Sequence, residues 1–238
     1  MCIRDRFKSN LLIVLIVSVF VFAACTSNEI GESKDVAQDK IYQRYSISYT
    51  EGNTNAEIFC QFRFAGVNGT TLVLNSPSQL QFDGEKLPVD SSSGSGAYYK
   101  TDKPVTNFYG KHTLIFTNTD AKKLENSFSF DNFKLVNLPA TVSKQQSFNL
   151  NFETAALQAD DYIEVGTNNT DSSFSISHTA QQGTAIVIPA EELKRQKGNE
   201  LTLEATLYRK VPLQQSTGEG GEIEIRYSLK PVKIKLTN

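Results

Sequence analysis

The side chains best suited to catalysis or metal binding are scattered along this 238-residue chain. Its two histidines, His112 and His178, have no cysteine or histidine neighbour at the spacing of a zinc site. The adjacent carboxylates Asp160–Asp161 precede a predicted strand, and Glu191–Glu192 open a predicted helix, where the helix dipole favours negative charge. We therefore predict no catalytic residue, no metal site and no cofactor, and we expect that the protein is not an enzyme.

Three tyrosines near a glycine-rich loop are the candidate ligand contacts. Tyr98 and Tyr99 directly follow the segment SSSGSGA, and Tyr109 follows soon after. Adjacent strand residues point to opposite faces, so one tyrosine of the first pair should face outward. Exposed tyrosines beside loops can stack on sugars or on a protein partner, and the alternative is ordinary core packing or isolated exposure.

Cys25 carries the clearest chemical signal, because it ends a signal-peptide pattern. A positive start with Arg4, Arg6 and Lys8 precedes the apolar run Leu11–Ala24, and small residues stand before the cysteine. The run is shorter than the ~20 apolar residues that a membrane-spanning helix needs.

Residues 22–25 (Phe-Ala-Ala-Cys) resemble the lipobox of bacterial lipoproteins, with Phe22 in place of the usual leucine. The resemblance implies that residues 1–24 are a signal peptide and that Cys25 receives acyl chains such as palmitate. The protein would then be held in the outer membrane of the cell envelope, on either its periplasmic or its surface face. Ordinary secretion, with Cys25 as an incidental thiol, is the alternative.

The charge of the chain limits which partners it can bind, and its cysteine content limits whether disulfides can stabilise it. The chain has 24 basic and 26 acidic residues, for a net charge of −2, spread evenly over both halves. Nucleic-acid binding needs a basic patch, so we predict no nucleic-acid partner. After processing only Cys25 and Cys60 would remain, and acylation of the first leaves no pair for a disulfide.

Hydrophobic residues alternate with polar ones through most of the chain, which predicts strands with one buried face. In Asn55–Phe64, for example, Cys60 shares its face with four apolar residues. Residues 25–40 are polar and lack aromatics, which predicts a flexible tether. The pattern resets near Pro139, so we predict two tandem immunoglobulin-like β-sandwiches in an all-β chain, over residues 41–138 and 139–238. Pro231 marks either a hairpin corner or a kink in one long strand.

A family resemblance accompanies this pattern. Residues 186–236 (IVIPAEELKRQKGNELTLEATLYRKVPLQQSTGEGGEIEIRYSLKPVKIKL) resemble the closing domain of uncharacterised lipoproteins from the Bacteroidota. Residues 112–130 (HTLIFTNTDAKKLENSFSF) are similar to a run in the preceding domain of those proteins. The resemblance implies a lipoprotein of two sandwich domains and assigns no catalytic residue.

These patterns favour a membrane-anchored lipoprotein that acts as a non-catalytic interaction or structural module. A surface glycan-binding lipoprotein, with Tyr98, Tyr99 or Tyr109 on the contact face, is the first alternative. A hydrolase with a site between the two domains is the second. The expected partners are thus the membrane, through the lipid, and a protein or a glycan.

Acylation of Cys25 predicts that labelled palmitate fed to expressing cells enters the wild type and not the Cys25→Ser variant. The reason is that the thiol is the only attachment point that the lipobox pattern provides. The measurement is incorporated label on the protein band after gel separation. Equal labelling of the two proteins would contradict the assignment.

Overall fold

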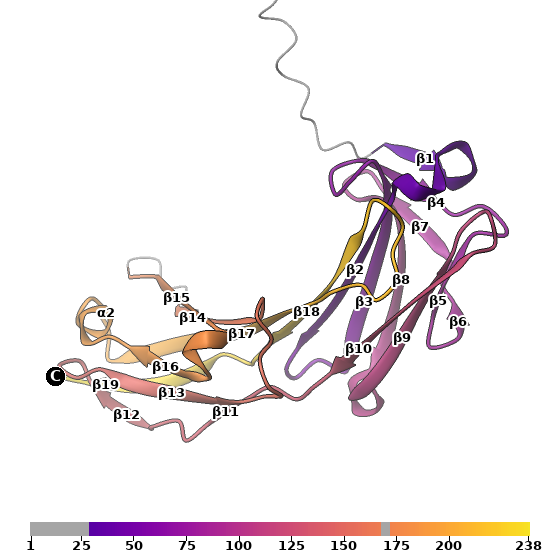
Figure 1. The fold of residues 1–238 in the computed structure, drawn as a ribbon. Helices are drawn as coiled ribbons and strands as arrows, with labels where there is room; N and C mark the ends of the chain where they lie inside the picture. The colour runs from indigo at the N-terminus through magenta and orange to yellow at the C-terminus, as the bar shows by residue number, and fades with distance from the viewer. Residues whose placement is uncertain (1–28, 168–171) are drawn as a thin grey trace, which may run out of the picture.

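The computed structural model describes residues 29–167 and 172–238, which form two β-sandwich lobes that meet at an angle (Figure 1). Strands are the main element of these residues, and the single α-helix among them, α2 (Ala190–Lys194), includes Glu191–Glu192, where the sequence predicts a helix to begin. No described helix is long and apolar enough to cross a membrane. The predicted all-β class is confirmed.

The first lobe packs two sheets face to face. One sheet has β2, β3 and β8 at its centre, and the other has the order β10-β9-β5-β6. The strands of this lobe are β1 (Ile30–Glu32), β2 (Ile41–Thr50), β3 (Asn55–Phe64), β4 (Thr70–Val73), β5 (Gln79–Phe82), β6 (Glu85–Lys86), β7 (Val89–Ser92), β8 (Gly96–Pro104), β9 (Gly110–Thr117) and β10 (Lys123–Phe130). Short 3₁₀ helices cover Ser33–Asp35, Gln38–Lys40 and Val105–Asn107.

The second lobe repeats the sandwich arrangement. One sheet has the order β11-β13-β16, and the facing sheet runs β12-β19-β17-β14-β15. Its elements are β11 (Lys134–Val136), β12 (Thr141–Ser143), β13 (Phe148–Glu153), β14 (Tyr162–Thr167), β15 (Phe174–Thr179), a 3₁₀ helix (Ala180–Gln182), β16 (Ala185–Ile188), α2, β17 (Glu200–Val211), β18 (Gly221–Ser228) and β19 (Val232–Thr237).

The strand orders confirm the immunoglobulin-like architecture. In the second lobe the three-stranded sheet contains the first, second and fifth core strands, which are β11, β13 and β16. A short strand, β12, pairs in parallel with the last strand, β19. In the first lobe β2, β3 and β8, extended by β4 and β7, lie in one sheet, and β5, β6, β9 and β10 form the other. Both orders belong to the group of immunoglobulin and fibronectin sandwiches.

A long hairpin of β17 and β18 joins the lobes into one structure. The first half of β17 pairs with β19 in the second lobe, and its second half pairs with β18. Strand β18 then pairs in parallel with β2 of the first lobe, over all eight residues from Gly221 to Ser228. As a result one twelve-stranded sheet runs through both lobes.

The tip of this hairpin also closes the free edge of β10. The Gln215 backbone N–H donates to Asn126 Oδ1 at 3.0 Å, and Asn126 Nδ2 donates back to the Gln215 carbonyl at 2.9 Å. Asn126 is fully buried, so both partners of its amide come from the other lobe's hairpin. Thr217 Oγ1 adds a 2.6 Å bond to the Ile41 carbonyl at the start of β2.

The structure differs from the predicted domain limits in two places. Residues 30–40, expected as a flexible tether, form β1, which pairs in parallel with β4, and two 3₁₀ helices. Ser33 there is fully buried, and its hydroxyl accepts from the Asn75 N–H at 2.9 Å. Strand β11 lies before the boundary expected at Pro139 and pairs with β13, so the second lobe begins earlier, near Lys134.

Pro231 lies at a kink in one long strand and not at a hairpin corner. Strands β18 and β19, on either side of Leu229–Pro231, both pair antiparallel with β17. Proline has no N–H to donate, so the ladder is interrupted there and resumes at Val232. Lys233 consequently forms an ion pair with Glu200 on β17, at 2.7 Å.

The hydrophobic core follows the alternation read from the sequence. Inward side chains of β2 and β3, such as Tyr45, Ile58 and Phe62, are fully buried, and Phe62 packs on Phe116 of the facing sheet with ring centroids 4.4 Å apart. Cys60 is fully buried among them, as its position in the alternating pattern predicts.

Burial raises the pKa of the Cys60 thiol above its ordinary value, so the thiol stays protonated at neutral pH and lacks access to reagents. In a chain with Cys2→Ser and Cys25→Ser, we expect a disulfide reagent to label Cys60 slowly in native buffer and quickly in denaturant. The measurement is absorbance of the released thiolate. Immediate stoichiometric labelling without denaturant would place this strand face in solvent.

A buried ion-pair network holds the junction of the lobes. Arg209 on β17 donates from Nε to Asp161 Oδ2 at 2.9 Å and from Nη1 to Asp131 Oδ2 at 2.7 Å. Its Nη2 donates to the Ala155 carbonyl at 3.2 Å. Asp161 is fully buried, and Asp131 belongs to the connection between β10 and β11. The network therefore ties the hairpin to the linker and to the start of β14.

Replacing Arg209 by alanine should lower the free energy of unfolding by about 3–5 kcal/mol, because the buried Asp161 carboxylate loses its cation. Urea unfolding followed by circular dichroism measures the change. The exposed Arg226→Ala variant is the control and should stay within about 0.5 kcal/mol of the wild type. A loss of the same small size in both variants would show that the network does not hold the junction.

Candidate functional site

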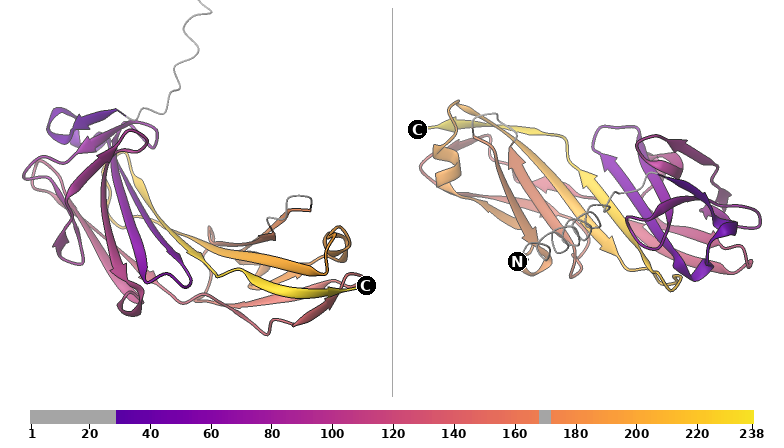
Figure 2. Two further views of the ribbon diagram at one scale, coloured as in Figure 1. Left: turned by 180° about the vertical axis from the view of Figure 1, so that it is seen from behind. Right: turned by 90° about the horizontal axis from the view of Figure 1, so that it is seen from above.

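The outward face of the twelve-stranded sheet lines the inner side of the bend between the lobes (Figures 1 and 2). Strands β14, β17, β18, β2, β3 and β8 follow one another across this face. The smaller sheets, β10-β9-β5-β6 and β11-β13-β16, lie on the outer side. The inner side is therefore a concave surface to which both lobes contribute side chains.

One row of directly paired residues crosses this concave surface. Each member is the register partner of the next on the neighbouring strand, and all of them point away from the core. We call this set the polar row; its members, in order from β15 to β8, are Thr179, Tyr162, Tyr208, Arg226, Ser48, Glu57 and Asp102. Because β18 pairs with β2, the row passes from one lobe to the other without a break.

The aromatic part of the polar row is a stack with a cation beside it. The rings of Tyr162 and Tyr208 lie nearly parallel, with centroids 4.6 Å apart. The Arg226 guanidinium carbon lies 5.8 Å from the Tyr208 centroid, within the range of a cation–π interaction. Burial, aided by the charges of neighbouring acidic groups, raises the pKa of Tyr162, so its hydroxyl stays protonated and able to donate at neutral pH.

A first hollow, of about 250 Å³, lies beside this stack. Its floor includes Gly166 of β14, which has no side chain on this face, and Tyr208 and Arg226 line it. A Cβ at Gly166 would come within 2.6 Å of the Phe174 carbonyl oxygen of β15, so the close approach of the two strands requires glycine here.

Carboxylates and hydroxyls complete the walls of the first hollow. Glu164 and Glu204 line it together with Thr206 and Ser175. Ser175 Oγ donates to Glu164 Oε1 at 2.5 Å, which orients that carboxylate. On the next strand Thr206 Oγ1 lies 3.0 Å from the Ser228 hydroxyl. The first hollow is thus lined by hydrogen-bond acceptors, a cation and an aromatic ring.

A second hollow, of about 410 Å³, lies in the other lobe. Its lining is almost wholly polar and consists of Ser48, Tyr49, Thr50, Asn53, Thr54, Asn55, Glu57, Lys100 and Asp102. Lys100 pairs with Glu57, and this hydrogen bond raises the pKa of the lysine. Arg226 of the first hollow and Ser48 of the second are register partners on β18 and β2, so the polar row links the linings of the two hollows.

The three tyrosines predicted as ligand contacts do not form one site. Tyr99 belongs to the core: it is 3% exposed, packs edge-on against Phe62, and its hydroxyl accepts from the Leu74 N–H at 2.7 Å. Its role as a ligand contact is therefore corrected, because β8 alternation turns it inward.

Tyr98 and Tyr109 are accessible, but Tyr98 lies near the start of β8, whereas Tyr109 lies beyond that strand, directly before β9. Tyr98 stacks on Phe59 with centroids 5.0 Å apart, and a hydrogen bond to Asp90 raises its pKa. Tyr109 is 46% exposed, and its hydroxyl lies 3.2 Å from that of Tyr227 at the lobe junction. Neither tyrosine belongs to the polar row.

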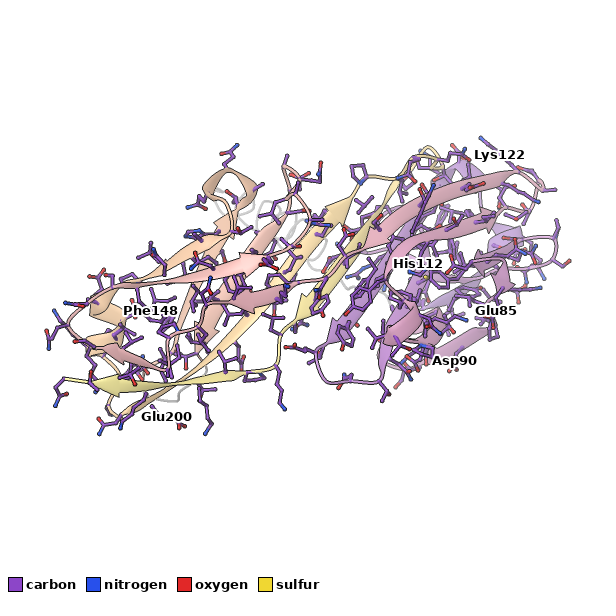
Figure 3. All side chains as sticks on the ribbon, turned by 90° about the horizontal axis from the view of Figure 1, so that it is seen from below. Glu85, Asp90, His112, Lys122, Phe148 and Glu200 are labelled. Carbon is purple, nitrogen blue, oxygen red and sulfur yellow. The ribbon has the colours of Figure 1, made fainter. Side chains whose placement is uncertain are left out.

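The remaining candidates from the sequence are placed as follows. Cys25 lies outside the described residues. His112 lies within the first lobe (Figure 3), stacked on Phe108 and bonded to Asp83 Oδ2 at 2.7 Å, whereas His178 is on β15 of the second lobe. Among residues 29–167 and 172–238, no three His, Cys, Asp or Glu side chains gather as a metal site would need.

In both adjacent carboxylate pairs, the position of the side chains is explained by their role in the fold. Asp161 takes part in the Arg209 network, and both of its oxygens also accept backbone N–H groups, from Gln158 and Lys210. Glu191 and Glu192 lie in the first turn of α2, where the dipole favours them.

Sequence reasoning missed Tyr162, Tyr208 and Arg226. Alternation places all three outward, but it does not show that β14, β17 and β18 are neighbours with this register. A signal was present in the tyrosines themselves, since each interrupts a polar outward face with a large ring.

Comparisons with known proteins do not assign the chain to a family. No family model matches the chain, and no curated protein matches it. Among solved structures it is similar to one titled "Structural insight into host cell surface retention of a 1.5-MDa bacterial ice-binding adhesin", with TM-score 0.28 and 8% identity over 85% of this chain and 67% of that one. It is also similar to the crystal structure of Dpr11 IG1 bound to DIP-gamma IG+IG2, with TM-score 0.24 and 9% identity over 83% and 98% of the two chains. At such TM-scores the likeness carries no argument about function.

Proposed function

We propose that this protein is a lipid-anchored, non-catalytic interaction module of the cell envelope, which binds a partner on its concave sheet face. The observation that carries the proposal is the pair of hollows on one face of one sheet, linked by the polar row. Binding sites are concave and contain convergent polar groups, and the first hollow also has the ring of Tyr208 in its wall.

The construction of the sheet supports a binding role. Side chains on regular strands are held more precisely than side chains on loops, and here β17 and β18 keep the contributions of both lobes in register. The polar row therefore needs little ordering when a partner binds, which lowers the entropic cost of association.

The proposed anchor fits the position of β1. Ile30, the first residue of β1, follows Cys25 by five positions, and a chain reaches at most about 3.6 Å per residue. An acyl group on Cys25 would thus hold the β1–β4 end of the first lobe within about 18 Å of the membrane surface. The second lobe, joined through the hairpin, would extend from that fixed point.

Photo-crosslinking in intact cells tests the binding face. A photo-reactive phenylalanine derivative replaces Tyr208 on the concave surface, and in the control it replaces Ser129, which is exposed on β10 of the opposite sheet. We expect discrete crosslinked species from position 208 and not from position 129, resolved as mobility shifts after denaturing electrophoresis. Identical patterns from the two positions, or no species from position 208, would contradict the proposal.

A further inference from the structure

We propose that the polar row binds an uncharged oligosaccharide, laid across the strands from the first hollow to the second. This inference rests on the proposed binding role of the concave face and names the class of ligand that it takes. The observation that carries it is the combination, on one sheet face, of the tyrosine stack and the guanidinium group of the polar row with the oriented Glu164 carboxylate, which lines the first hollow beside that row.

The lining of the hollows matches the two kinds of surface that a sugar ring presents. Sugar C–H groups pack on aromatic carbon, and the half-buried Tyr208, stacked on Tyr162 and next to Arg226, contributes aromatic carbon to the lining of the first hollow. Sugar hydroxyls both donate and accept, and beside the ring they meet the acceptor Glu164 and the donor Arg226. Hydrogen bonds to charged partners are stronger than those between neutral groups.

Charged groups of both signs in each hollow, two acidic and one basic, favour a neutral ligand over a polymer of one sign. The first hollow carries Glu164 and Glu204 against Arg226, and the second carries Glu57 and Asp102 against Lys100. A polyanion would meet carboxylates in both hollows, and a polycation would meet the guanidinium and the ammonium group. Like-charge contacts of this kind act against such partners. A hydroxylated, uncharged chain finds a partner for each of its groups without that repulsion.

The length of the row favours a chain of sugar units over a single one. Neighbouring strands lie about 4.8 Å apart, and six such steps separate β15 from β8, so the row spans about 29 Å. The second hollow, lined by serine, threonine and asparagine side chains, offers further hydrogen bonds along this path. The lobes are joined by β18 pairing with β2, so a single extended ligand contacts both.

Affinity electrophoresis tests the ligand class. The full chain carrying Cys25→Ser, purified without lipid, is run in native gels that contain dextran, laminarin, mannan or xylan as neutral polymers. Polygalacturonate and chitosan serve as the acidic and the basic polymer. We expect at least one neutral polymer to retard the protein and the two charged polymers not to do so.

Variants locate the binding. Tyr208→Ala should weaken the retardation about tenfold, as loss of an aromatic contact does, and Glu164→Gln should weaken it while preserving side-chain size. Tyr98→Ala is the matched control, since Tyr98 is also a half-buried tyrosine on the outward face but lies outside the row. Its affinity should equal that of the wild type, and thermal melts of all three variants should show intact folding.

Each outcome bears on one proposal or on both. Retardation by no neutral polymer, or an equal loss in Tyr98→Ala and Tyr208→Ala, overturns the sugar site. If position 208 then still gives crosslinked species and these are proteins, the binding role of the concave face stands with a different partner. If neither experiment gives a signal, both proposals fall.

Discussion

The parallel pairing of β18 with β2 is the contact on which the rest of the molecule depends. Without it β2 would be an exposed edge of the first sandwich, and unpaired strand edges favour association with other chains. Eight consecutive residue pairs give this edge a partner that belongs to the other lobe. Around the same hairpin, the buried amide of Asn126 and the carboxylate of Asp161 obtain their partners. Polar groups at such depth are costly unless they are bonded, so these contacts also select one relative arrangement of the lobes.

This pairing has a direct geometric consequence for the outward face. Side chains on paired strands form rows at right angles to the strands, and a row continues only as far as the register does. The ladder from β14 through β17 and β18 to β2 aligns Tyr208 and Arg226 of the second lobe's hairpin with Ser48 of the first lobe. A simple linker between two sandwiches would have left these groups on separate surfaces.

The inward and outward faces of individual strands could be predicted from the sequence, because alternation is a local property. The burial of Cys60 follows from it, and so does the outward position of one tyrosine of the Tyr98–Tyr99 pair, which the structure shows to be Tyr98. The pairing of β2 with β18 could not be predicted, since more than 170 positions separate the two strands and either strand alone would accept other neighbours. For the same reason the sequence left two alternatives at Pro231, a hairpin corner and a kink in one long strand. Only the pairing of both β18 and β19 with β17 distinguishes them.

The residues before β2 and the tyrosines show a further limit of local patterns. Residues 30–40 are polar, yet they are held by pairing of backbone groups with β4 and by the buried hydroxyl of Ser33, neither of which has a hydrophobic signature. Tyr98, Tyr99 and Tyr109 were predicted as ligand contacts because they lie close to the glycine-rich loop in the sequence. The stacked pair on the concave surface comes instead from two tyrosines 46 positions apart, Tyr162 and Tyr208, which only the register brings together.

The first hollow arises from a requirement of folding. Strands β14 and β15 approach so closely that a side chain at Gly166 would collide with the Phe174 carbonyl, and the missing side chain leaves a depression on the outward face. Glycine within a strand weakens it, so the surrounding ladder must hold that segment in place. Packing thus explains why the depression exists but does not require what surrounds it. The tyrosine stack, the guanidinium and the oriented carboxylate contribute no side chain to the core, and small polar residues would satisfy an outward strand face equally well. Folding therefore gives no reason for these groups around a depression that the backbone itself creates, whereas the proposed recognition of a ligand would supply one.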